Sequence, residues 1–146
     1  MSRRPRFFLL LLTGLAVGCK PLPVAEPALE PPAIRLPQTV KVLNAEQAAA
    51  WIQAGPGRSI LDVREDWEIR KFGALPNSVW ADFLNKQRFE EAVSKLDKSR
   101  PCLVYCAIGG RSRQAVAGLV AKGFTDLSWL EAGFEAWVQS GRPVTR

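Results

Sequence analysis

The sequence predicts an α/β domain over residues 39–146, with a mostly parallel central sheet and helices on both faces. Two patterns indicate this class. Short β-prone runs alternate with amphipathic segments, and one run, Cys102–Tyr105, is apolar throughout, which is typical of a strand buried on both faces. The chain has 146 residues, of which 47% are hydrophobic and 23% charged, and these values exclude a wholly disordered protein.

Each expected strand is a run of apolar or β-branched residues bounded by turn formers or by a helical pattern. The third run is the weakest, because only three residues follow the turn residues Pro76 and Asn77. In chain order, the strands are expected at Val40–Leu43, Ser59–Val63, Ser78–Trp80, Cys102–Tyr105 and Leu127–Leu130.

Apolar residues at helical spacing predict the helices between these strands. In the first helix, Asn44 and Gln47 have capping-box spacing, and Ala48, Trp51 and Ile52 share one face. Further helices are expected at Glu65–Lys71, as one or two turns, and around the apolar stripes Phe89–Leu96, Ala115–Val120 and Phe134–Val138.

Composition excludes several classes of function. The chain has no histidine, so Cys-His and Ser-His-Asp catalysis and imidazole metal sites are excluded. The net charge is +6, but Arg3, Arg4 and Arg6 supply half of it, and the scattered remainder does not indicate a nucleic-acid partner. Three cysteines fit neither a disulfide scaffold nor paired zinc ligands. No metal and no organic cofactor are expected.

Residues 1–18 have the pattern of a bacterial signal peptide. A basic start precedes the uncharged stretch Phe7–Val17, which is too short to span a bilayer, where about 20 apolar residues are needed. The run Leu15–Cys19 resembles a lipobox, in which the Cys19 thiol is lipidated and becomes the new N-terminus. A plain cleaved signal peptide and an uncleaved anchor are the alternatives.

Residues 19–38 are expected to form the lipid-anchor cysteine and a proline-rich tether. Six of the eleven prolines lie in this stretch, which favours an extended spacer reaching up to roughly 60 Å. Lys20 follows Cys19, where many lipoproteins retained in the inner membrane have Asp, so the outer membrane is favoured. We therefore expect an exported protein in the cell envelope, attached to the membrane through Cys19 and facing the periplasm.

The loop after the apolar strand is the candidate catalytic site. Cys106 follows the strand at its carboxyl end, where its sulfur is expected to reach solvent. Gly109 and Gly110 allow backbone N–H groups to turn toward an anion, and the next helix is expected to begin near Ser112 with its positive end toward the sulfur. Arg111 adds a positive charge. These features favour the thiolate of Cys106, so that no general base is needed.

The alternative is that Cys106 is a buried structural residue, as isolated free cysteines often are. Cys102 lies on the same strand about 13 Å away, which is too far for a disulfide, and it is expected to pack in the core.

The five tryptophans divide into two groups. Trp51 and Trp137 lie on apolar helical stripes and are expected in the core. Trp67 and Trp80 follow Arg64 in the chain and are candidates for the mouth of the pocket.

Three motifs resemble the single-domain rhodanese family over residues 39–142: Leu61–Glu65, Cys106–Ser112 and Leu130–Trp137. The resemblance implies a rhodanese-like fold, in which Cys106 takes sulfur from a sulfane-sulfur donor as a persulfide and passes it to cyanide or a thiol. It implies that Asp62 and Arg64 shape the pocket, with Arg64 among the substrate-binding residues. The other substrate-binding residues that it implies are Ala107, Ile108, Gly109, Gly110 and Arg111.

The chain departs from the family pattern at two places. Gly73–Pro76 reads Gly-Ala-Leu-Pro where the family usually has Gly-His-Ile-Pro, and Ala132-Gly133 stands where the family has Gly-Gly. The missing histidine is neither a nucleophile nor a base in that chemistry, and Ala132 concerns backbone freedom only.

The sequence thus predicts a sulfurtransferase that uses thiosulfate or polysulfide as donor and cyanide or a thiol as acceptor. The six-residue loop from Cys106 to Arg111 is one residue shorter than the Cys-x5-Arg loop of cysteine phosphatases, so phosphate and arsenate chemistry are disfavoured. The alternatives are a catalytically idle binding module and a persulfide carrier or thiol-redox protein with a dedicated partner. The physiological donor, the acceptor and the oligomeric state stay open.

Overall fold

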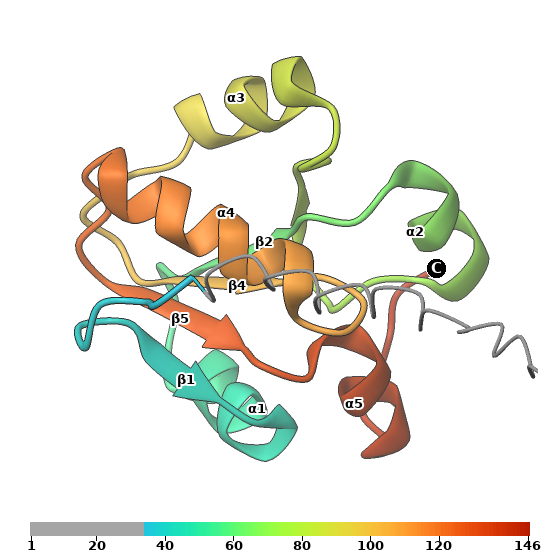
Figure 1. The fold of residues 1–146 in the computed structure, drawn as a ribbon. Helices are drawn as coiled ribbons and strands as arrows, with labels where there is room; N and C mark the ends of the chain where they lie inside the picture. Colours follow the sequence, from blue (N-terminus) through green and yellow to red (C-terminus); the bar gives the residue numbers. More distant parts are fainter. Residues whose placement is uncertain (1–33) are drawn as a thin grey trace, which may run out of the picture. The chain divides into compact units, whose positions relative to one another are not determined.

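The computed structural model describes residues 34–146, which form one α/β unit (Figure 1). Strands and helices alternate along the chain as the sequence predicts. The elements are β1 (Lys41–Leu43), α1 (Ala45–Gln53), β2 (Ser59–Asp62), α2 (Asp66–Phe72), β3 (Val79–Trp80), α3 (Lys86–Ser94), β4 (Cys102–Tyr105), α4 (Gly110–Ala121), β5 (Leu127–Leu130) and α5 (Gly133–Gln139).

The five strands form one sheet in the order β1-β5-β4-β2-β3, and all neighbouring pairs are parallel. Strand β4 lies in the middle, and all four of its residues are buried. The predicted central strand Cys102–Tyr105 and the predicted α/β class are therefore confirmed. Because the strands are parallel, their carboxyl ends meet at one edge of the sheet, where the loop after β4 begins.

Helices cover both faces of the sheet, as predicted (Figure 1). Helices α3 and α4 pack on the face that carries Val104, and helices α1 and α5 pack on the face that carries Leu103. Trp51 and Trp137 belong to the second of these cores, as their helical stripes predict. Alternation along β4 places Cys102 and Cys106 on the same face as Val104.

Most element boundaries lie within one or two residues of the prediction. The expected capping box of α1 is present: the Gln47 N–H donates to the Asn44 side chain, 2.8 Å, and the Asn44 N–H donates to the Gln47 side chain, 3.0 Å. Helix α4 begins at Gly110, two residues before the predicted start near Ser112. The reason is that Gly109 takes the N-cap position in a left-handed conformation, φ 97°, so the helix begins directly after it.

The predicted signal peptide, Cys19 and most of the predicted tether lie outside the described residues. Of the tether, residues 34–38 are described: they are coil and turn, and Leu36 packs against the core on the α4 face. Within residues 34–146, no helix is both long enough and apolar enough to cross a bilayer.

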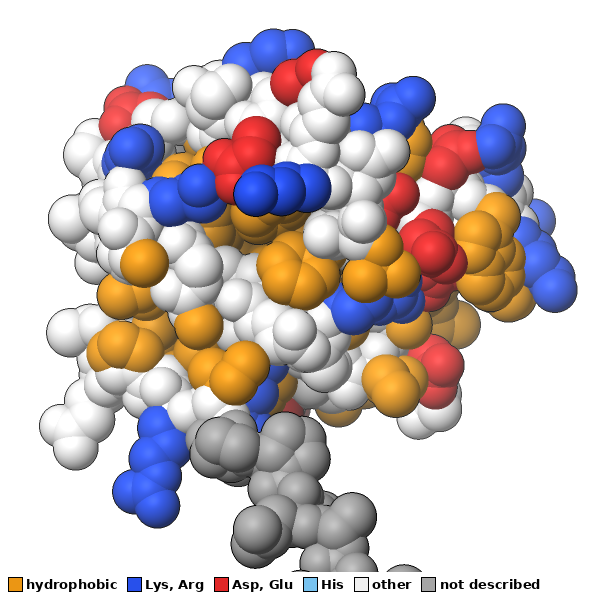
Figure 2. All heavy atoms as spheres, turned by 45° about the horizontal axis from the view of Figure 1, so that its top comes forward, with side chains coloured by type: hydrophobic (Ala, Val, Ile, Leu, Met, Phe, Trp, Pro, Cys, Tyr) orange, Lys and Arg blue, Asp and Glu red, His pale blue; other side chains and the backbone are white. Residues whose placement is uncertain are grey.

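Charged side chains are mixed on the face of the molecule that Figure 2 shows. Lysine and arginine side chains are spread among acidic and apolar ones and do not gather into one basic patch. This matches the scattered charge of the folded part of the sequence.

The buried position of β4 gives a stability prediction. Leu103 is fully buried, so Leu103→Ala is expected to lower the free energy of unfolding by about 2–5 kcal/mol, because it removes apolar contacts and leaves a cavity. The matched control Val42→Ala lies on the edge strand β1 at 49% exposure, and its effect is expected to stay within about 0.5 kcal/mol. Urea denaturation of both variants measures the difference, and similar losses would contradict this view of the core.

Candidate active site

Cys106 follows β4 directly, and its sulfur lies under the loop that leads to α4. The sulfur accepts the Gly109 N–H at 3.1 Å and lies 3.4 Å from the Ser112 hydroxyl oxygen. Cys106 is only 1% exposed, so the expectation that its sulfur reaches solvent is wrong. The sequence pattern placed the cysteine at the strand end, but it did not show that the loop closes over the sulfur. A reaction partner meets this sulfur only after the side chain rotates or the loop shifts.

The loop can close because Gly109 has no side chain. Its positive φ disfavours other residues, and a Cβ at this position would overlap the carbonyl oxygen of Glu131. Helix α4 then starts at Gly110, and the first N–H groups of a helix have no acceptor within the helix. The loop therefore brings a helix N-terminus and the Gly109 N–H close to one sulfur atom.

The N-terminus of α5 fixes the loop from its other side. The Phe134 N–H donates to the Cys106 carbonyl, 2.8 Å, and the Glu135 N–H donates to the Ala107 carbonyl, 3.1 Å. This close approach requires Gly133, since a Cβ there would overlap the same two carbonyl oxygens. Ala132 has φ −91° and needs no glycine, so its departure from the family pattern is accommodated.

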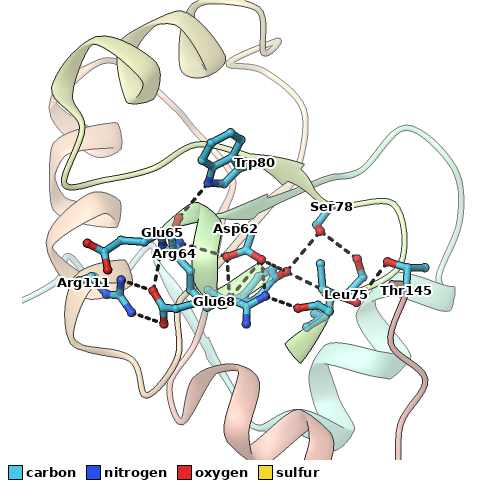
Figure 3. A network of polar contacts seen from close by, with 12 residues as sticks. Asp62, Arg64, Glu65, Glu68, Leu75, Ser78, Trp80, Arg111 and Thr145 are labelled. Carbon is cyan, nitrogen blue, oxygen red and sulfur yellow. Dashed lines mark hydrogen bonds and ion pairs between the residues drawn. The ribbon is translucent and has the colours of Figure 1, made fainter. Parts of the chain in front are cut away.

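Arg111 is paired with a carboxylate that the sequence did not single out. Its two terminal nitrogens donate to the two oxygens of Glu68 at 2.6 and 2.7 Å, as Figure 3 shows. Glu68 belongs to the capping box of α2 and also accepts the Glu65 N–H, 2.9 Å. The charge of Arg111, expected to act on the sulfur, is thus largely balanced by Glu68.

This pairing affects the titration of Glu68. Burial alone would raise the pKa of the carboxyl, but the hydrogen bonds from Arg111 and from the Glu65 N–H outweigh burial and hold the pKa below its ordinary value of 4.5. Glu68 is therefore a carboxylate at neutral pH and keeps Arg111 in place.

Arg64 lies in a buried network at the end of β2 (Figure 3). Its guanidinium binds both oxygens of Asp62, with a shortest distance of 2.7 Å, and donates to the Gly73 carbonyl, also at 2.7 Å. The same group lies 3.9 Å from the ring centre of Phe134 and is 1% exposed. It supports the wall of the site, and a direct contact between Arg64 and a substrate stays a prediction.

Tyr105, on the central strand, joins this network. Its hydroxyl donates to Asp62 and accepts the Leu75 N–H at 3.1 Å. Burial, helped by the adjacent Asp62 carboxylate, raises the pKa of Tyr105 well above its ordinary value, so the hydroxyl keeps its proton and remains a donor. The turn after α2 is thereby attached to β4.

Ser112 contacts the Cys106 sulfur, and Trp129 holds Ser112 in place. Neither role was predicted from the sequence. Ser112 is fully buried; its hydroxyl contacts the Gly109 carbonyl at 3.0 Å and accepts the Trp129 indole N–H at 3.1 Å. The sequence signal for Ser112 was that a small polar residue stands in the first turn after the loop. No sequence pattern connects it to a tryptophan on β5.

The other substrate-binding candidates lie where their chain positions suggest. Ala107 is partly buried, Ile108 is exposed at 68%, and Gly110 opens α4. Their contact with a substrate stays a prediction.

Cys102 is a core residue, as predicted. It is 1% exposed, and burial raises the pKa of its thiol to about 12. Both described cysteines are free thiols. Among residues 34–146, no three Cys, Asp or Glu side chains gather in a way that would hold a metal ion.

A pocket of about 450 Å³ adjoins the loop, and its lining residues decide the predictions for Trp67 and Trp80. Trp67 lines it, together with Ala107 and Phe134. Trp80 does not: it lines a separate groove beside α3, and its indole N–H donates to the Arg64 carbonyl, 2.9 Å, as Figure 3 shows. The prediction is thus confirmed for Trp67 and wrong for Trp80.

Comparison with protein families agrees with this geometry. Residues 44–140 match the family of the rhodanese-like domain. The chain belongs to that family. The resemblance seen in the three sequence motifs is therefore confirmed for the family and the fold.

Related proteins include sulfurtransferases. Over 97 residues the chain is 33% identical to the thiosulfate sulfurtransferase GlpE of Pseudomonas savastanoi pv. phaseolicola, an alignment that covers 66% of this chain and 86% of GlpE. It is 32% identical over 98 residues to the probable adenylyltransferase/sulfurtransferase MoeZ of Mycobacterium tuberculosis. That alignment covers 64% of this chain but 23% of MoeZ, so the chain spans less than a quarter of the MoeZ length.

Solved structures show the same fold. A rhodanese-related protein from Thermoplasma volcanium matches with a TM-score of 0.61 and 30% identity over 72% of this chain and 97% of that one. The polysulfide-sulfur transferase homodimer from Wolinella succinogenes matches with a TM-score of 0.60 and 25% identity, covering 73% of this chain and 79% of its own. Membership of this family thus supports the general assignment of the chain as a sulfurtransferase.

The Glu68–Arg111 pair gives a pH-dependent prediction. Glu68→Gln is expected to lower the free energy of unfolding by about 1–3 kcal/mol at pH 7, because a charged hydrogen-bond acceptor is lost. Since the folded-state pKa of Glu68 lies below 4.5, its contribution is complete above that pH and disappears as the pH falls through the folded-state value.

Denaturant unfolding at a series of pH values checks this expectation. The gap between wild type and Glu68→Gln should close in acid, where the wild-type carboxyl is protonated in both states. Glu91→Gln, on the exposed side of α3, is the matched control and should show a small effect throughout. A gap that stays constant from pH 7 down to pH 2 would contradict the role of the ion pair.

Proposed function

We propose that the protein is a sulfurtransferase that carries sulfane sulfur on Cys106. The Cys106 thiolate attacks the outer sulfur of thiosulfate or of a polysulfide, and the donor's S–S bond breaks with its electron pair leaving on sulfite or on the shortened polysulfide. A thiol or cyanide then attacks the outer sulfur of the Cys106 persulfide. The bond to the Cys106 sulfur breaks, and that sulfur takes back the electron pair as thiolate.

The observation that carries this proposal is the placement of the Cys106 sulfur beside the Gly109 N–H and the start of α4. Hydrogen-bond donors and a helix N-terminus stabilise negative charge, which resides on sulfur both in the thiolate and in the persulfide. Membership of the rhodanese-like family and similarity to a thiosulfate sulfurtransferase support the same chemistry.

The loop is poorly suited to phosphate. Arg111 is engaged in a two-point ion pair with Glu68, and Ser112 stands where a cysteine phosphatase has its arginine. A phosphatase loop must hold the oxygens of the phosphoryl group while that group is bonded to the cysteine, and this needs several donors and a free guanidinium. Single-sulfur transfer makes smaller demands, because one negative atom must be stabilised.

Two alternative functions predict different behaviour of Cys106. An idle binding module would keep the fold without forming a persulfide, although Cys106 and its N–H contact argue against this reading. A persulfide carrier would load sulfur but release it only to a dedicated partner, and would turn over slowly with cyanide.

Intact-protein mass spectrometry after incubation with thiosulfate or polysulfide tests the proposal. We expect wild type to gain one sulfur atom and Cys106→Ser to gain none, because Cys102, the other described thiol, is buried and burial raises its pKa. Cys102→Ala is the matched control and should load like wild type. Absence of the added sulfur in wild type with every donor would leave the binding module as the function.

Turnover separates the enzyme from the carrier. If the persulfide forms, transfer from thiosulfate to cyanide should proceed catalytically in wild type and stop in Cys106→Ser. Loading without multiple turnover would identify the carrier.

We also propose that the protein is exported to the cell envelope and anchored through lipid on Cys19. The proposal rests on the basic start, the short apolar stretch and the lipobox-like run Leu15–Cys19. Wild-type protein expressed in bacteria is expected to sediment with membranes, and Cys19→Ala is expected to lose this association. Membrane association that persists in Cys19→Ala would contradict the lipid-anchor proposal.

A further inference from the structure

A pocket of about 450 Å³ lies beside the catalytic loop, between α2 and α5. Its volume is in the range of small-molecule sites, roughly 300–1,000 Å³. Its walls are mainly apolar and aromatic. Its apolar side chains include Trp67, Phe72, Phe134 and Val138.

The apolar walls include groups that a folded protein usually buries. Trp67 is 55% exposed, Phe72 46% and Val138 47%, so three of the eight large apolar side chains exposed in the described part of the chain line this one pocket. Exposed apolar groups gathered at a hollow are typical of a binding site. They are also ordered: the Trp67 indole N–H donates to Glu65 at 2.6 Å, and Trp67 and Phe72 pack edge to face.

Two of the three charged groups in the walls are paired with other protein groups. Arg64 is bound by Asp62, and Glu68 is bound by Arg111. The third, Glu135, forms no ion pair within residues 34–146, and the Lys71 ammonium lies 5.1 Å from the ring centre of Phe72. The pocket therefore presents no guanidinium free for an anion, and its lining favours an uncharged body.

The pocket is attached to the reacting sulfur through the backbone. Phe134 and Glu135, two of its wall residues, donate their N–H groups to the carbonyls of Cys106 and Ala107. Ala107 itself lines the pocket. Because Ala107 directly follows Cys106 in the chain, a ligand in this pocket lies beside the loop that carries the sulfur.

From these observations we infer that this pocket binds the sulfur acceptor, and that the acceptor is a small thiol whose sulfur is carried on an uncharged apolar body. The inference rests on the proposed sulfur transfer and specifies its second half. The acceptor thiolate attacks the outer persulfide sulfur, forming a new S–S bond. The bond to the Cys106 sulfur breaks, and Cys106 keeps that electron pair and returns to the thiolate.

The test measures the two halves of the reaction separately. Protein is first loaded with sulfur from thiosulfate, and its discharge is then followed by mass spectrometry with benzyl mercaptan, 2-mercaptoethanesulfonate or cyanide. We expect wild type to discharge to benzyl mercaptan at least about tenfold more efficiently than to the anionic thiol, because only the former fills the apolar walls.

Variants connect this preference to the pocket. Trp67→Ala and Val138→Ser should each load sulfur like wild type and react normally with cyanide, but should lose most of the preference for benzyl mercaptan. Leu84→Ala removes a comparably exposed apolar side chain outside the pocket and should keep the preference. Equal discharge of both thiols by wild type, or an unchanged preference in both pocket variants, overturns the inference.

A binding measurement keeps the inference testable if no persulfide forms. Benzyl methyl sulfide has the same apolar body and no reactive thiol, and calorimetry reports its binding to Cys106→Ser. We expect saturable binding that weakens at least about fivefold in the double variant Cys106→Ser with Trp67→Ala. Failure to load sulfur together with saturable binding refutes the proposed function alone, whereas absence of binding refutes the pocket assignment.

Discussion

The buried ion pair between Asp62 and Arg64 is the interaction on which the rest of the site depends. Two charges removed from water are costly unless both are fully hydrogen bonded. Here Asp62 receives Arg64 and the Tyr105 hydroxyl, and Arg64 also binds the Gly73 carbonyl and covers the ring of Phe134. One pair of side chains therefore connects β2, the central strand β4, the turn after α2 and the first turn of α5. The pocket beside the loop lies between α2 and α5, so this network supports its walls.

Backbone contacts hold the loop, and they determine which neighbouring positions tolerate substitution. The α5 N–H groups hold the carbonyls of Cys106 and Ala107, and the closeness of that contact admits only glycine at position 133. Ala132, whose φ is ordinary, shows that the neighbouring position is free to vary. Side-chain identity matters where charge is balanced, as in the pair Glu68–Arg111.

Local patterns predicted the fold and the centre of the site, and contacts between distant residues escaped them. The apolar run Cys102–Tyr105 and the glycines after it were sufficient to place the strand, the loop and Cys106 between them, because period and turn chemistry act within a few residues. The pairing of Arg111 with Glu68 joins residues 43 positions apart, and burial of the Cys106 sulfur depends on the closed shape of the loop. Trp80 was misplaced for the same reason, since its chain position near Arg64 did not reveal which way its indole points.

The hydrogen bond from Trp129 to Ser112 has an optical consequence. The indole lies one hydroxyl group away from the reactive sulfur, so a change in the charge or size of that sulfur alters the local field at a chromophore built into β5. We therefore expect the emission of Trp129 to change when the proposed persulfide forms. The difference spectrum between wild type and Trp129→Phe isolates that signal from the emission of the other four tryptophans.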